Sequence, residues 1–87
     1  MKTKFILLKH LRTQAKEREI DTKLIEDTFS NPQQIVPETK GLKVAQSKYF
    51  DKIRKKEYLI RIIFREEQDL RIGITTYKTS KIKKYWR

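Results

Sequence analysis

The 87-residue sequence contains no cysteine, one histidine, two glycines and two prolines. Without cysteine it has neither a disulfide framework nor a thiolate nucleophile, which is typical of proteins in a reducing compartment. One histidine, and no group of carboxylates at ligand spacing, argue against a catalytic metal ion. Two glycines are too few for a glycine-rich loop that binds nucleotide phosphates. The sequence therefore predicts no metal and no cofactor.

Long apolar runs are also missing. The longest run is residues 5–8, whereas a membrane-spanning helix needs about 20 apolar residues and a signal-peptide core needs about 7–15. The basic part of the chain has the pattern of strands rather than of a basic amphipathic helix, which argues against a membrane-surface role. We expect a soluble, cytoplasmic protein with no membrane partner.

The length allows one domain, because so short a chain has too little interior for two cores. Apolar residues make up 37% of the sequence, which predicts a thin core and modest stability. Aromatic residues make up 10%, and several segments have clear periodicity, so disorder is not expected. We therefore predict that residues 1–87 form a single domain.

Positive charge is the strongest compositional feature. Basic side chains outnumber acidic ones by 22 to 11, which gives a net charge of +11. The excess is uneven: residues 1–39 carry 7 basic and 6 acidic side chains, whereas residues 40–87 carry 15 and 5. Charge that served solubility alone would be spread evenly. A concentrated positive field attracts polyanions and releases counterions on binding, so we expect a polyanion partner, with RNA the best candidate.

Two helices are predicted in the first third of the chain. Apolar residues 5–8 and the helical spacing after them indicate a short extended segment and a helix from about Lys9, or a helix that begins as early as Phe5. Asp21 is a favourable N-cap for a second helix, which the proline at position 32 ends. The buried stripe of this helix is expected to contain Leu24, Ile25, Thr28 and Phe29.

Beyond the second helix, apolar residues alternate with the period of two that is typical of strands. Two helices followed by strands predict an α+β fold, in which the two N-terminal helices pack on a three- to four-stranded antiparallel sheet. Residues 79–87 are expected to be a tail or a short helix with Ile82, Tyr85 and Trp86 on one face. The strands are predicted at residues 33–36, 42–50, 58–65 and 70–77.

Strand alternation also predicts which side chains share a face. One face is expected to pack on the helices and to include Ile60, Ile62 and Phe64. The opposite face is expected to present basic residues together, which favours phosphate binding over mere solvation when it is combined with the local charge excess. The residues predicted on this face are Arg61, Arg65, Arg71 and Tyr77, joined by Lys48.

A cation-rich site without a metal suits the cleavage of RNA, because RNA carries its own nucleophile in the 2′-hydroxyl. Such a reaction needs in-line positioning, proton transfer and cations on the phosphorane, and arginine matches phosphate oxygens well. The candidates for proton transfer are His10, Tyr77, Tyr85 and a lysine. Crowded positive charge is expected to lower the pKa values of tyrosine and lysine toward neutrality.

Three segments together resemble one bacterial family. His10-Leu-Arg-Thr-Gln-Ala-Lys-Glu-Arg18-Glu-Ile20 is similar to its opening motif of a histidine, then Glu-Arg, then Gly-Ile. Asn31-Pro-Gln-Gln-Ile35 resembles the turn after its second helix, and residues 76–87 resemble a closing segment seen especially in cyanobacterial members. The family is a bacterial domain of unknown function that is associated with the RelE- and BrnT-like toxins of type II toxin–antitoxin pairs.

The resemblance covers nearly the whole chain. It implies a compact helix-helix-sheet toxin fold, metal-independent cleavage of messenger RNA, and neutralisation by a small antitoxin. On the positions that match, it implies functional roles for His10, Arg18 and Tyr77. The chain departs from the pattern at Gln14, where arginine is common, and at Glu19, where glycine is common.

Together these observations predict a toxin-type endoribonuclease that acts on messenger RNA, either free or on the ribosome, and that binds a cognate acidic antitoxin. Two alternatives stay open: a non-catalytic RNA- or ribosome-binding module, and an interaction protein for an acidic partner. The predicted catalytic residues are His10, Arg18, Arg61 and Tyr77. The predicted RNA-binding residues are Lys48, Arg65, Arg71, Lys78, Lys81 and Lys84.

Overall fold

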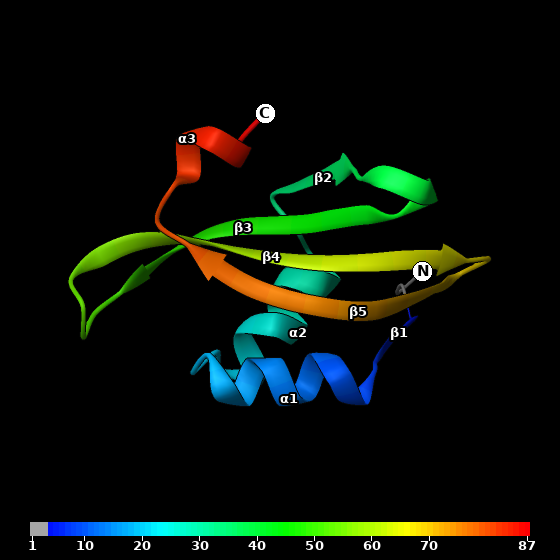
Figure 1. Cartoon of the computed structure of the whole chain (residues 1–87), viewed down its shortest axis with the longest axis horizontal. Coiled ribbons are helices and arrows are strands. Elements are labelled where there is room, and N and C mark those ends of the chain that lie inside the picture. Colours follow the sequence, from blue (N-terminus) through cyan, green and yellow to red (C-terminus); the bar gives the residue numbers. More distant parts are fainter. Residues whose placement is uncertain (1–3) are drawn as a thin grey trace.

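The computed structural model describes residues 4–87, in which helices and one twisted sheet form a layered molecule (Figure 1). Its elements, in chain order, are β1 (Lys4–Leu7), α1 (Lys9–Glu17), α2 (Thr22–Ser30), β2 (Gln34–Pro37), the 3₁₀ turn η1 (Thr39–Gly41), β3 (Lys43–Asp51), β4 (Lys56–Glu67), β5 (Leu70–Thr79) and α3 (Ile82–Tyr85). None of the helices within residues 4–87 is both long and apolar enough to span a membrane.

The sheet has five strands in the order β1-β5-β4-β3-β2. Strands β2 to β5 pair antiparallel with their neighbours, whereas β1 pairs parallel with β5. The predicted α+β class with two N-terminal helices is confirmed. The predicted three- to four-stranded antiparallel sheet is wrong, because the sheet is mixed and β1 adds a fifth strand. A four-residue strand whose partner lies more than 60 residues away carries too weak a local pattern to be assigned to a sheet.

The bounds of the two long helices agree with the prediction, and those of α2 follow its capping signals. The first helix begins at Lys9 after an extended segment, as predicted. Asp21 caps α2 through a hydrogen bond of 2.9 Å that its side chain accepts from the backbone N–H of Lys23. The helix ends at Ser30, and its C-cap residue Asn31 stands directly before the proline. Local capping chemistry therefore sets the bounds of α2, whereas α1 begins without a side-chain cap.

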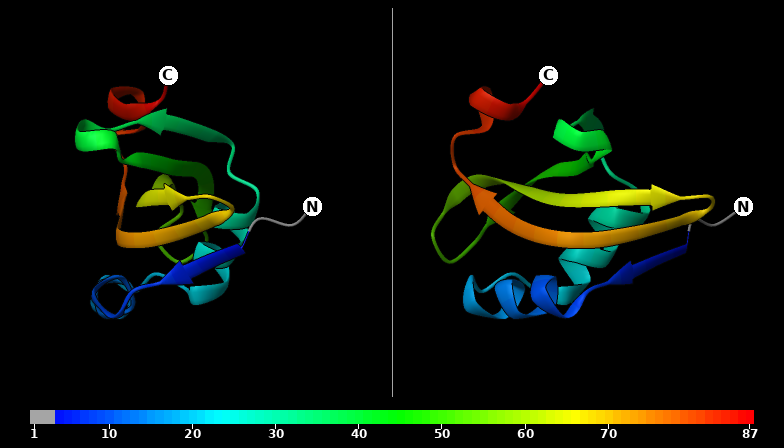
Figure 2. Two further views of the ribbon diagram at one scale, coloured as in Figure 1. Left: turned by 90° about the vertical axis from the view of Figure 1, so that its right-hand side faces the viewer. Right: turned by 45° about the vertical axis from the view of Figure 1, so that its right-hand side comes forward.

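One face of the sheet packs against α1 and α2 (Figures 1 and 2). Phe29 of α2 meets Phe64 of β4 edge to face, with ring centroids 5.2 Å apart. Each large apolar side chain buried here contributes about 1.5–3 kcal/mol. The even-numbered residues of β4 therefore face the helices, as the alternation predicts. The buried core of this layer consists of Leu11, Ala15, Ile20, Ile25, Phe29, Ala45, Ile60, Ile62 and Phe64.

Strand β5 does not keep the predicted alternation. Ile63 pairs with Thr75, but the next residue, Phe64, pairs with Gly73, which leaves Ile74 as an extra residue in a β-bulge. The bulge turns Gly73 toward the helices: a Cβ atom there would lie 2.9 Å from a leucine of α1 and 3.2 Å from a phenylalanine of α2. Residues of β5 that precede the bulge therefore point to the face opposite to the one predicted.

The outer edge of β5 is covered first by β1 and then by α1. At the end of β1, the backbone N–H of Leu8 donates to the Gly73 carbonyl at 3.1 Å. Further along, Gln14 Oε1 accepts from the backbone N–H of Thr76 at 3.2 Å, and the Arg18 guanidinium donates to the Thr76 carbonyl at 2.7 Å. Side chains of α1 thus satisfy backbone groups that an open strand edge would leave unpaired.

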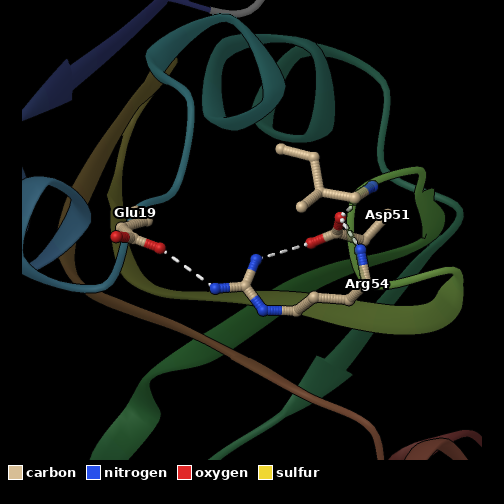
Figure 3. Close-up of polar contacts among 4 residues, drawn as sticks. Glu19, Asp51 and Arg54 are labelled. Atoms are coloured by element: carbon tan, nitrogen blue, oxygen red, sulfur yellow. Dashed lines mark hydrogen bonds and ion pairs between the residues drawn. The ribbon is translucent and has the colours of Figure 1, made fainter.

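The β3–β4 hairpin projects at one end of the sheet and is tied back to the helical layer by Arg54 (Figures 1 and 3). Its guanidinium forms ion pairs of 2.9 Å with Asp51 and 3.0 Å with Glu19. Asp51 also accepts from the backbone N–H groups of Ile53 and Arg54. Glu19 lies between α1 and α2 with a φ of 55°, in the left-handed region. The hairpin is therefore anchored to the helical layer at its turn.

Candidate functional site

A row of polar side chains crosses the sheet on the face turned away from the helical core. Arg61 of β4 lies opposite both Tyr77 of β5 and Gln46 of β3, and Gln46 lies opposite Gln34 of β2. Directly paired residues on neighbouring strands point to the same face. Four strands therefore contribute one side chain each to this line, which we term the Arg61 row.

The guanidinium of Arg61 is buried in this row, with 6% of the residue exposed. Its Nε donates to Gln46 Oε1 at 2.9 Å, and its Nη1 donates to the Tyr77 hydroxyl at 2.5 Å. The Tyr85 ring centroid lies 4.2 Å from its Cζ. None of the ion pairs formed within residues 4–87 involves Arg61. Buried charges are usually paired, so this guanidinium is a positive charge without a carboxylate counterion.

Helix α3 and the residues after it lie across the Arg61 row. The Gln34 amide forms two hydrogen bonds with the backbone of Arg87: its Nε2 donates to the carbonyl at 2.5 Å and its Oε1 accepts from the N–H at 3.2 Å. The Nε2 of Gln46 donates to the Tyr85 carbonyl at 3.1 Å. No residue of α3 is fully buried. Of the two alternatives expected for residues 79–87, a tail or a short helix, the structure has the short helix α3, and polar contacts hold this segment to the sheet.

Tyr77 keeps its proton at neutral pH. Burial raises the pKa of Tyr77 above its ordinary value of 10.0, although the hydrogen bond and the charge of Arg61 act in the opposite direction. The expectation that positive surroundings would lower this pKa is therefore wrong for Tyr77, because transfer from water disfavours the phenolate more than one guanidinium favours it. The hydroxyl accepts a hydrogen bond from Arg61 and has its own proton to donate.

An open pocket of about 620 Å³ lies beside the row. It brings Lys48, Lys81 and Lys84, which were predicted to bind RNA, to one place together with Lys83. The Nζ of Lys48 lies 4.1 Å from the Trp86 ring centroid, so α3 also helps to hold this strand lysine in place. We term this the lysine pocket. Its lining consists of Lys48, Glu57, Ser80, Lys81, Ile82, Lys83 and Lys84.

Arg71 lies on the other face of the sheet. It precedes the bulge in β5, and its guanidinium donates to the Phe29 carbonyl at the end of α2, at 3.1 Å. Its Nε also lies 3.5 Å from Glu66 Oε2. The prediction that Arg71 shares a face with Arg61 is therefore wrong, because the extra residue at Ile74 reverses the alternation.

Lys78 and Arg65 are also separate from the Arg61 row. Lys78 pairs with the core residue Ile60 and so lies on the helix side, with its Nζ 5.6 Å from the Tyr58 ring centroid. Lys78 and Lys48, both predicted to bind RNA, therefore lie on opposite faces of the sheet. Arg65 shares the face of Arg61 by alternation along β4, but it is exposed and its Nε lies 3.3 Å from Glu67 Oε1.

His10 lies in α1 and Arg18 is the C-cap residue of that helix. Helix α1 lies at the opposite side of the molecule from α3 in every view (Figures 1 and 2). His10 is exposed in the first turn of α1. Arg18 is at the other end, where it binds the Thr76 carbonyl. Of the two, only Arg18 connects to the row, because it holds the backbone of the residue before Tyr77. His10 is not brought together with the Arg61 row.

Sequence reasoning missed the two glutamines that complete the row. Neutral amides contribute nothing to a charge pattern, so Gln34 and Gln46 carry no compositional signal. One signal was available: Gln46 stands directly after two apolar residues in the middle of a predicted strand, where a buried side chain is expected. A buried glutamine needs polar partners, and it finds them in Arg61, Gln34 and the Tyr85 carbonyl.

No group of three or more histidine or acidic side chains within residues 4–87 is arranged to hold a metal ion. The donors of the Arg61 row are a guanidinium, two amides and one phenol, which suit an anion rather than a cation. Comparison of the chain with protein-family models, curated sequences and solved structures gives no match. The candidate site is therefore interpreted from its own chemistry.

Proposed function

We propose that this protein is a toxin-type endoribonuclease that cleaves messenger RNA without a metal ion. The observation that carries the proposal is the contact between Arg61 and Tyr77, in which a buried guanidinium without a carboxylate partner lies 2.5 Å from a protonated phenol. An unpaired buried cation is a favourable site for a phosphate, and the phenol beside it is a proton donor.

In the proposed reaction, the 2′-hydroxyl of RNA loses its proton to solvent water and attacks the adjacent phosphorus, while the bond between phosphorus and the 5′-oxygen breaks. Arg61 stabilises the negative charge that develops on the phosphorane oxygens, an effect worth about 10²–10³ in rate for one preorganised donor. Tyr77 donates its proton to the leaving 5′-oxygen, which is a stronger base than a phenolate. The Tyr77 phenolate that results from protonating the leaving oxygen regains its proton from solvent. Because the pKa of Tyr77 is raised, the residue acts as the general acid rather than as the base.

The lysine pocket binds the phosphates that flank the cleaved bond. Four lysines line it, with Glu57 as the only acidic residue among them. Lysine contacts with phosphates give affinity that depends little on sequence and strongly on salt. This division of roles assigns chemistry to the Arg61 row and substrate binding to Lys48, Lys81 and Lys84.

Two features support a RelE- or BrnT-like toxin in particular. The chain has two N-terminal helices on one face of a sheet and a polar row on the other. The position where the resembling family has glycine is Glu19, whose backbone has a φ of 55°, the region that favours glycine. An acidic antitoxin is the partner expected for a domain with a net charge of +11.

A non-catalytic RNA- or ribosome-binding module is the second candidate, and one observation favours it. Tyr85 lies over the Arg61 guanidinium, and only 6% of Arg61 is exposed. A phosphate reaches Arg61 only when α3 shifts. Without such a shift, the lysine pocket alone would bind RNA and nothing would be cleaved.

Replacing Tyr77 with phenylalanine separates these two functions. The Tyr77→Phe variant should cleave labelled single-stranded RNA in EDTA at least 10²-fold more slowly than the unmodified protein, because it lacks the proton donor. Its RNA affinity should stay within about twofold, because the lysine pocket is unchanged. The products of the unmodified protein should end in a 2′,3′-cyclic phosphate.

Tyr58→Phe is the matched control, since Tyr58 is a half-buried tyrosine on the helix side of the same sheet. Equal loss in both variants would indicate damage to the fold rather than to the site. If the unmodified protein binds RNA and leaves it intact, with and without ribosomes, the binding module is correct and the nuclease is not. Growth arrest on induction tests the toxin role separately.

A further inference from the structure

Phe50 is a large aromatic side chain that the fold leaves in solvent. It lies near the end of β3 and is 60% exposed. The other large aromatic residues of the strands are at least half buried or belong to the core. Exposing a phenylalanine forgoes most of the ~1.5–3 kcal/mol that its burial would contribute, so the structure gives this side chain no stabilising role of its own.

The surroundings of Phe50 are those of the lysine pocket. It lies two residues after Lys48 on the same strand, so both side chains point to the same face as the Arg61 row. Its cross-strand partner is Glu57, which lines the pocket together with Lys48. An exposed aromatic ring therefore stands at the rim of a pocket whose lining carries four lysines.

An exposed aromatic ring beside a lysine-lined pocket suits single-stranded nucleic acid better than a protein partner. The core of a protein interface is depleted in charged residues, whereas the pocket beside Phe50 is lined mostly by them. Single-stranded nucleic acid needs a positive surface for its phosphates and aromatic rings on which its bases stack. Phenylalanine has no polar group, so stacking on it would accept any base.

We infer that Phe50 is a stacking platform for an unpaired RNA base whose neighbouring phosphates lie in the lysine pocket. The inference rests on the proposed function, in which the same pocket binds RNA. It restricts the substrate to single-stranded segments, because a base inside a duplex already has both faces covered by its neighbours and has none to offer to Phe50.

The test is the equilibrium binding of a fluorescent, single-stranded 2′-O-methyl oligonucleotide, measured by anisotropy at low salt. Phe50→Ala should raise the dissociation constant about fivefold or more, the low end of the loss typical when one base–aromatic stack is removed. Phe50→Trp should restore the affinity. Binding to a duplex of the same sequence should be weaker than to the single strand and should not respond to Phe50→Ala.

Ile53→Ala is the matched control, since Ile53 is an apolar residue of the same hairpin that is 90% exposed. Equal affinities of Phe50→Ala and the unmodified protein would overturn the inference, and so would an equal loss in Ile53→Ala. Both side chains project from the sheet, so the variants should keep the thermal midpoint of the parent, which circular dichroism checks.

The experiment is independent of catalysis, because a 2′-O-methyl group removes the nucleophile. If the unmodified protein does not bind the single strand, the inference fails, whereas the cleavage of ordinary RNA by the same preparation still decides the proposed function. If Phe50→Ala weakens binding but ordinary RNA stays intact, the stacking platform stands and the nuclease fails.

Discussion

Arg61 contributes to the structure as well as to the proposed chemistry. Its removal would leave Gln46 Oε1 without a donor inside the sheet and would empty the space beneath Tyr85. Leaving a buried polar group unpaired costs about 1–3 kcal/mol, a large part of the stability of a domain with a thin core. Arg61→Ala therefore tests the fold and the site together. Tyr77→Phe is the cleaner change, because it keeps the ring and deletes only the hydroxyl.

At the residue scale, Asp51 should make the stability of the protein depend on acid pH. The hydrogen bond from the backbone N–H of Arg54 is the largest effect that lowers the pKa of Asp51 below its ordinary value of 3.8. Because the folded-state pKa is lowered, the stabilisation is present above pH 3.8 and is lost as the pH falls through the folded-state pKa. Asp51→Asn keeps an acceptor for the backbone N–H groups and removes the charge.

Asp51→Asn should therefore lower the thermal midpoint at pH 7, as measured by circular dichroism. The difference between the midpoints of the variant and the unmodified protein should shrink as the pH falls below 3.8. Asp69→Asn, in the exposed β4–β5 turn, changes the net charge equally and is the control. A difference that stays constant from pH 7 to strongly acid pH would show that the carboxylate charge contributes nothing.

At the scale of elements, α3 differs from α1 and α2 in how it is attached. The two long helices pack through apolar side chains, whereas α3 is a single turn without a fully buried residue. Amide groups of the sheet hold its backbone, and the rings of Tyr85 and Trp86 lie against cationic groups. A segment held mainly by a few polar contacts opens at a lower free energy than the core, which is what access to Arg61 requires.

Gln34→Ala should release the end of this segment without unfolding the sheet. Both hydrogen bonds between Gln34 and the Arg87 backbone would be lost. Trp86 is the only tryptophan, so its fluorescence emission should shift to longer wavelength as the ring becomes more exposed to water. Ile35→Ala, at an exposed position of the same strand, should leave the spectrum unchanged. An unchanged spectrum in Gln34→Ala would mean that the side-chain contacts alone hold α3.

At the scale of the whole molecule, the positive charge is concentrated in the sheet and the tail rather than in the helices. Acidic residues of the sheet already form ion pairs with basic ones: Glu66 pairs with Lys43, and Asp51 pairs with Arg54. The lysine pocket keeps four lysines around one acid. A field of this kind steers polyanions to one face and makes their association sensitive to ionic strength.

The salt dependence of RNA binding should therefore report the lysine pocket directly. For a single strand, the slope of the logarithm of affinity against the logarithm of salt is about −0.7 for each phosphate neutralised. Lys84→Ala should reduce the magnitude of that slope by about 0.7. Lys23→Ala, which removes an exposed lysine from α2, should leave it unchanged. Equal slopes in both variants would place the RNA elsewhere on the molecule.

The sequence determined what depends on neighbours along the chain. The cap at Asp21, the stop before the proline, the apolar stripes of both helices and the alternation of β4 are set within a few residues of each position. For the same reason, the placement of Arg61 and Tyr77 on one face was predictable.

Only the tertiary structure decided what depends on distant partners. The extra residue at Ile74 is defined by pairing with β4, and it moved Arg71 to the helix side. The covering of Arg61 by Tyr85 joins elements 24 residues apart in the chain. Hydrogen bonding and packing between distant segments produce no periodic pattern in the sequence. Which residues share the site was therefore decided by the arrangement of the sheet and of α3.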